Sequence, residues 1–127
     1  MKSKNIVQTS NAPEAIGPYS QAVINDNIVY CSGQIAMDPK NGKLIEGGIE
    51  DQIKQVMNNL EAILLEAGAG FDKVIKCSIF LDDMDHFDTV NEVYANYFIV
   101  NPPARETMAV KSLPRNAMVE ISCIAYL

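Results

Sequence analysis

The stretch IEDQIKQVMNNLEAILLEAG, residues 49–68, decides the fold class, because its apolar residues recur at helical spacing. These apolar residues share one face: Ile49, Ile53, Val56, Met57, Leu60, Ile63, Leu64 and Ala67. Glu50 and Asp51 occupy the first turn, where the helix dipole favours negative charge. Gly68 supplies a C-terminal stop. We therefore predict an amphipathic helix from Ile49 to Gly68.

The segments on either side alternate like strands. QAVINDNIVYCSGQIAM (21–37) predicts two strands joined by a hairpin turn at residues 25–27, and DPKNGKL (38–44) predicts a second turn. KVIKCSIFL (73–81) alternates as a further strand. A second helix is then expected, capped by the aspartates at 82, 83 and 85 and ended by Pro102 and Pro103. Its inward residues would be Phe87, Val90, Tyr94, Tyr97 and Phe98.

Two last strands, ETMAVKSL (106–113) and AMVEISCIAYL (117–127), are predicted to form a hairpin around residues 114–117. The element order is therefore ββ–α–β–α–ββ, which is an α+β fold. Two amphipathic helices have enough apolar surface to cover only one side of such a sheet. The other side must be covered in another way, and association of subunits would cover it.

Arg105 and Glu120 raise a question about that uncovered side. Arg105 follows the stiff Pro102-Pro103 pair, and in the predicted hairpin it shares the uncovered face with Glu120 and lies opposite Tyr126. Glu120 could simply pair with Lys111, its expected cross-strand neighbour. Alternatively Arg105 and Glu120 belong to one site. They would lie roughly 20 Å apart within a chain, so a shared site would have to form between subunits.

Composition excludes several classes of protein. The chain has 127 residues, which is one domain (1–127), with 48% hydrophobic and 20% charged residues. Its net charge is −6 and its basic residues are scattered, so nucleic-acid binding is not expected. The segment MKSKNIVQTS (1–10) turns polar at once, so we expect no secretory signal, and no apolar run approaches the roughly 20 residues that span a bilayer. We expect a cytoplasmic protein that does not bind membranes.

Metal and triad chemistry are not expected either. Cys31, Cys77 and Cys123 lack CxxC spacing and lie in apolar runs, which indicates buried free thiols. His86 is the only histidine, so a histidine-based metal cluster is excluded. Nothing in the sequence ties His86 to Ser32, so a hydrolase triad is not favoured.

Five segments carry a resemblance to a known family: AIGPYSQAV (15–23), VYCSGQIAMDPKNGKL (29–44), TVNEVY (89–94), PPAR (102–105) and VEISCIA (119–125). In this order and spacing, they resemble the Rid family, the reactive intermediate deaminases (YjgF/UK114, also known as endoribonuclease L-PSP). The similarity runs over essentially the whole chain. Arg105 makes it specific for the imine-hydrolysing branch.

The resemblance implies a chorismate-mutase-like α+β fold with two helices on one face of a mixed sheet. It also implies a homotrimer with clefts between subunits. The implied activity is cofactor-independent hydrolysis of 2-iminobutanoate and 2-iminopropanoate to 2-oxo acids and ammonia. Arg105 would clamp the substrate carboxylate, Tyr19 would close the cleft, and Glu120 would position water. Ser32 and Gly33 would line the cleft, and Asn91 would support the site. Thr107 would contribute a main-chain contact.

Two positions depart from many relatives. Thr107 stands where cysteine is common, and Glu106 stands where a small residue is common. Imine hydrolysis does not need a thiol nucleophile, so we expect activity to survive. Glu106 should point away from Arg105, although its charge could weaken anion binding. Two other classes stay open: a sensor that binds 2-oxo acids without turnover, and a ribonuclease, which the negative charge disfavours.

Overall fold

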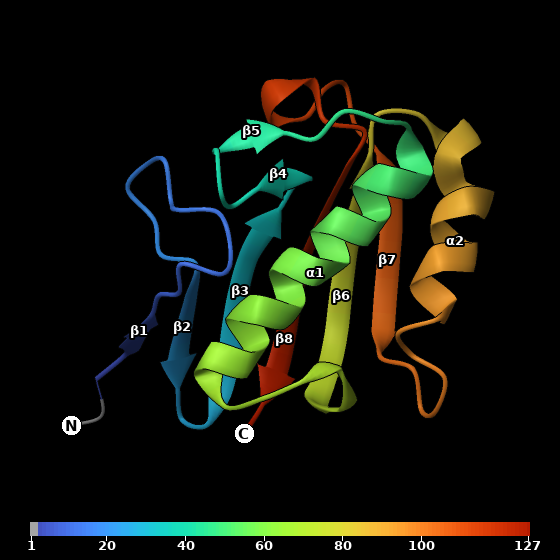
Figure 1. Ribbon diagram of the computed structural model, residues 1–127. Helices are drawn as coiled ribbons and strands as arrows, with labels where there is room; N and C mark the ends of the chain where they lie inside the picture. Colours follow the sequence, from blue (N-terminus) through green and yellow to red (C-terminus); the bar gives the residue numbers. More distant parts are fainter. Residues whose placement is uncertain (1–2) are drawn as a thin grey trace.

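A computed structural model describes residues 3–127, and these form a six-stranded main sheet, with two helices packed on the same face of it, and a small two-stranded sheet (Figure 1). The main sheet has the strand order β1-β2-β3-β8-β6-β7. Its strands are β1 (Asn5–Val7), β2 (Ala22–Asn25), β3 (Ile28–Gln34), β6 (Val74–Leu81), β7 (Ala104–Ala109) and β8 (Val119–Tyr126). The alternation in the sequence predicted all of these strands except β1, which is three residues long and largely exposed.

The two predicted turns of the N-terminal half are confirmed. β2 and β3 pair antiparallel, and the residues between them, Asp26 and Asn27, have φ values of 51° and 64°. Positive φ at both central positions is the geometry of a two-residue hairpin turn. The second turn joins the short strands β4 (Met37–Asp38) and β5 (Lys43–Leu44), with Gly42 at φ 69°.

The first predicted helix is confirmed as α1 (Ile49–Ala67), which ends at Gly68 in a left-handed conformation with φ 91°. The second helix, α2, is shorter than expected. It runs from Phe87 to Ala95 after a single 3₁₀ turn at Met84–His86, so the prolines at 102 and 103 do not end it. Those prolines instead lead directly into β7. Further 3₁₀ turns lie at Phe71–Lys73 and Pro114–Asn116.

The predicted hairpin of the last two strands is wrong. β8 lies between β3 and β6, and β7 pairs parallel with β6 at the edge of the sheet. The physical reason is the helix between β6 and β7: a strand, a crossover helix and a second strand form a parallel βαβ unit. Arg105 is therefore opposite Cys77, not Tyr126.

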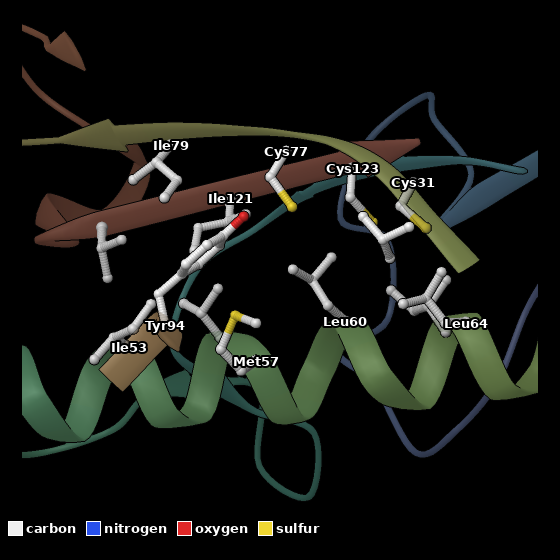
Figure 2. Close-up of a cluster of buried hydrophobic side chains, with 14 of the residues drawn as sticks. Cys31, Ile53, Met57, Leu60, Leu64, Cys77, Ile79, Tyr94, Ile121 and Cys123 are labelled. Carbon is white, nitrogen blue, oxygen red and sulfur yellow. The ribbon is translucent and has the colours of Figure 1, made fainter. Parts of the chain in front are cut away.

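The two faces of the sheet differ as the sequence indicates. α1 and α2 cover one face, and the core between α1 and the sheet includes Leu60, Leu64 and Ile121, all at most 1% exposed (Figure 2). The opposite face carries Tyr30, Met108 and Tyr126, which are each more than 40% exposed. Within residues 3–127, no helix combines the length and apolar character needed to cross a membrane.

Candidate functional site

Arg105 lies near the start of the edge strand β7, on the face that the helices cover. Its Nη1 donates a hydrogen bond of 2.6 Å to Oδ1 of Asn91 on α2. Its guanidinium carbon lies 5.1 Å from the ring centre of Tyr94 and 5.7 Å from that of Phe87. Two of the predicted site residues, Arg105 and Asn91, are therefore brought together. The prediction that Arg105 shares the uncovered face is wrong, because its partner Cys77 faces the helices.

Arg105 is oriented but not neutralised. In the described part of the chain, it forms no ion pair, and its contacts are an amide oxygen and two neutral rings. The chain has 16 acidic side chains against 10 basic ones, so an exposed arginine without an acidic partner is notable. The charge and the remaining N–H groups stay available for an anion.

Thr107 follows two residues later on the same face of β7, opposite Ile79. Its Oγ1 is inaccessible to solvent, and no residue from 3 to 127 offers it a hydrogen bond. A hydroxyl in this position does not reach the surface beside Arg105. The expectation that Thr107 contributes through its main chain stays a prediction.

The other predicted site residues surround a second feature, a cleft of about 340 Å³. Tyr19 and Ser32 line it together with Gly33 and Glu120. Ser32 donates from its Oγ to the carbonyl oxygen of Ser20 at 2.6 Å, which ties the loop that carries Tyr19 to strand β3. Tyr19 is 49% exposed at the mouth of this cleft.

The loop over this cleft is ordered by one buried side chain. The Gln21 amide accepts from Thr9 N at 2.7 Å and donates to the carbonyl oxygens of Thr9 and Pro13 at 3.0 and 2.8 Å. These bonds satisfy both ends of an amide that is only 3% exposed. The segment before Tyr19 is therefore fixed in place.

Glu120 is the second residue of β8 and points to the face without helices, between the buried Val119 and Ile121. It lies so close to Gly33 that a Cβ on that glycine would meet the Glu120 carboxylate at 2.5 Å. Partial burial raises the pKa of Glu120. Its predicted pairing with Lys111 is wrong, since its cross-strand neighbour is Phe80. A half-buried carboxylate of raised pKa is suited to proton transfer.

The predicted residues thus fall into two groups on opposite faces of the sheet. Arg105, Asn91 and Thr107 belong to the β7–α2 edge, and the cleft holds the others. Strands β7 and β8 are separated by β6, so Arg105 and Glu120 are also about 10 Å apart across the sheet. One small acid cannot contact both within a single chain.

Glu106 points away from Arg105, as expected. Its carboxylate accepts from Ser78 Oγ at 2.6 Å and lies 3.5 Å from Lys76 Nζ. The Ser78 hydrogen bond and then the Lys76 charge lower the pKa of Glu106. Because this charge is paired on the other face, it does not compete with an anion at Arg105.

The residues considered for other chemistry have ordinary partners. Ser32 bonds to the loop, whereas His86 pairs with Asp82 at 3.3 Å before α2, so they form no triad. The cysteines are buried and free, as predicted, and occupy one row across β3, β8 and β6 (Figure 2). From residue 3 to 127, no three histidine, cysteine or acidic side chains are grouped to bind a metal.

The fold and these motifs agree with a known family. The family model described as endoribonuclease L-PSP matches residues 9–127. The chain belongs to the Rid family. A Rid family protein from Yersinia pestis has the same fold, with a TM-score of 0.94 and 46% identity over 98% of this chain and 100% of that one.

Two further Rid relatives bear on the site. The human protein named 2-iminobutanoate/2-iminopropanoate deaminase is 45% identical over 122 residues, covering 96% of this chain and 89% of its own. The crystal structure of E. coli TdcF with bound serine has a TM-score of 0.92 and 36% identity, covering 97% of this chain and 98% of that one. These relatives are named for small-molecule chemistry and for binding an amino acid.

Sequence reasoning missed the role of two aromatic residues in this Rid chain. Phe87 and Tyr94 were expected only as inward-facing core residues, yet both also contact the Arg105 guanidinium. A signal was present: Phe87, Asn91 and Tyr94 follow i, i+4, i+7 spacing on one helix face. It could be used only once Arg105 was known to face α2.

Proposed function

We propose that the protein is an imine deaminase that hydrolyses small 2-imino acids, such as 2-iminobutanoate and 2-iminopropanoate, to 2-oxo acids and ammonia. The observation that carries this proposal is Arg105, oriented by neutral partners and, among residues 3–127, left without an acidic one. A planar guanidinium can grip a carboxylate through two parallel hydrogen bonds. Relatives named 2-iminobutanoate/2-iminopropanoate deaminase support the same substrate class.

Glu120 supplies the chemistry in this proposal. A protonated imine is already electrophilic, so the enzyme needs to fix it and direct a water molecule to its carbon. The Glu120 carboxylate accepts a proton as water adds, giving a carbinolamine. It then returns this proton to nitrogen, and as ammonia leaves, the carbinolamine hydroxyl gives its own proton to the carboxylate and becomes the carbonyl of the 2-oxo acid. These steps include no oxidation or reduction, and the proposed reaction needs no metal or organic cofactor.

We propose further that the working unit is a homotrimer with the site between subunits. Arg105 and Glu120 lie on opposite faces of one sheet, so a substrate gripped by one chain's arginine needs the open sheet face of another chain. The exposed apolar side chains on that face give the subunits a reason to associate.

A coupled assay tests the activity. An amino-acid oxidase generates the imine in the presence of semicarbazide, and an active deaminase lowers the initial rate of semicarbazone formation by consuming the imine. We expect wild-type protein to lower this rate and Arg105→Ala to have no effect. Equal rates with and without wild-type protein would overturn the proposal. Binding of 2-oxobutanoate without such an effect would favour a sensor that does not turn over its ligand.

Subunit mixing tests the shared site. Arg105→Ala should be inactive and Glu120→Gln should keep only a small residual activity, but a mixed trimer contains clefts with both wild-type residues. We expect activity to return after mixing and subunit exchange, and mass photometry to show trimers. Confirmed exchange without recovered activity would refute the assignment of the two residues to different subunits.

A further inference from the structure

Helix α2 presents three side chains in succession to Arg105. Phe87, Asn91 and Tyr94 are spaced i, i+4 and i+7, so they lie on one face of the helix. Asn91 accepts the 2.6 Å hydrogen bond from Nη1, and the two rings lie 5.7 and 5.1 Å from the guanidinium carbon. Both distances are within the roughly 6 Å range of a cation–π contact.

The Tyr94 ring is itself held firmly. It is 6% exposed, and its ring packs on that of Phe98 with 4.7 Å between centres. Phe98 in turn meets Phe71 edge-on at 5.4 Å. The Tyr94 ring beneath Arg105 is therefore part of the aromatic cluster of the core, and this packing holds the ring in place.

The hydroxyl of Tyr94 does not explain why an aromatic residue is needed here. It points toward the sheet at Cys77 (Figure 2), and no described residue gives it a geometrically sound hydrogen bond. Burial raises the pKa of Tyr94, and the Cys77 thiol raises it further, so the hydroxyl stays protonated. The part of Tyr94 that meets Arg105 is the ring face.

We propose that Phe87 and Tyr94 are positioning residues that hold the Arg105 guanidinium ready for a carboxylate, an inference that rests on the proposed function. Aromatic faces orient a guanidinium by cation–π attraction and stacking, yet they carry no charge to compete with the substrate. Fixing a long side chain in advance lowers the entropy lost on binding. An acidic partner would also fix Arg105, but it would occupy the hydrogen bonds that the substrate uses.

The test compares three variants. Tyr94→Leu removes the ring face, and Tyr94→Phe keeps it without the hydroxyl. Phe98→Leu is the matched control, because it removes a buried ring of the same cluster that does not touch Arg105. Phe87→Leu, at a partly buried position, serves as a second variant should Tyr94→Leu fold poorly.

Arginine Nε–Hε NMR signals report the contact without any substrate. Arg105 and Arg115 are the arginines of the chain, so Arg115 is an internal reference. Ring currents should place the Arg105 Hε signal upfield of that of Arg115 in wild type, Tyr94→Phe and Phe98→Leu. In Tyr94→Leu and Phe87→Leu the signal should move toward the reference. The proposal is overturned if the chemical shift of Arg105 Hε is the same in Tyr94→Leu and Phe87→Leu as in wild type.

Calorimetry with 2-oxobutanoate reports the consequence for binding. We expect Tyr94→Leu to weaken binding about three- to tenfold, the cost of immobilising one long side chain, with KM raised and kcat nearly unchanged. Tyr94→Phe should bind as wild type. Equal weakening by Phe98→Leu would overturn the proposal, since general packing would then explain the loss. If wild type binds no 2-oxobutanoate but the NMR shift responds as expected, the substrate assignment fails and the positioning role stands.

Discussion

Replacement of Gly33 by alanine tests whether turnover depends on where the Glu120 carboxylate lies. A Cβ at this position would lie 2.5 Å from Glu120 Oε2 and 2.8 Å from Cδ, whereas ordinary contact begins at 3.4 Å. To move from 2.5 Å to ordinary contact at 3.4 Å, the carboxylate has to retreat by about 0.9 Å. A misplacement of about 1 Å at a reacting group can cost on the order of a hundredfold in rate. We expect Gly33→Ala to lower kcat by about ten- to a hundredfold.

Stability should hardly change, because the atoms that move belong to the free end of one side chain. Gly33 does not have a positive φ, so alanine fits its backbone. We expect a free energy of unfolding within about 1 kcal/mol of wild type. Gly48→Ala is the matched control, since a Cβ there meets nothing within 4 Å, and it should keep wild-type kcat.

The coupled semicarbazone assay, calorimetry with 2-oxobutanoate and thermal unfolding together decide the outcome. Product binding should persist in Gly33→Ala, because Arg105 is untouched. Wild-type turnover in a folded Gly33→Ala protein would refute the reasoning, since the carboxylate would have moved without consequence. Loss of product binding together with turnover would show that alanine damages the cleft itself.

Two other substitutions follow from the same geometry. Glu120→Gln should remove the rise in kcat with pH that belongs to this carboxyl; a pH profile identical to wild type would contradict the role. Because burial raises the pKa of Glu120, the folded state disfavours its ionised form, so Glu120→Gln should also be more stable than wild type at neutral pH. That advantage should disappear below the pKa of an unfolded glutamate, as denaturant unfolding at several pH values can measure. Thr107→Ala should keep most activity, because Oγ1 is buried away from the surface; a loss above about a hundredfold, near 2.7 kcal/mol, would show that the hydroxyl takes part.

Local elements could be predicted from the sequence because their causes are local. The spacing of apolar residues fixed the limits of α1, and Asp26-Asn27 fixed the first hairpin. The end of α2 was harder to predict from the sequence. Apolar Tyr97 and Phe98 continue the helical period, yet they pack inward from the loop that follows Ala95.

The pairing of β7 could not be found from periodicity, since alternation does not say which strand is the neighbour. Proximity in sequence favoured β8, but the helix between β6 and β7 makes the parallel pair the better solution. This error reversed the face assigned to Arg105. Glu120 was placed on the correct face, because alternation along one buried strand determines it without knowledge of the partner.

The position of β8 has a consequence for how the chain is made. Every other strand of the main sheet precedes β8 in the sequence, yet β8 joins β3 to β6 at the centre. During synthesis, the β2–β3 hairpin and the β6–α2–β7 unit emerge first, and until β8 follows no strand pairing joins these two parts of the sheet. Each leaves an unpaired edge, the kind of surface that promotes aggregation of unfinished chains. A nascent chain that ends before residue 119 thus lacks a central strand rather than an edge strand, and the unpaired edges of β3 and β6 are both open to aggregation.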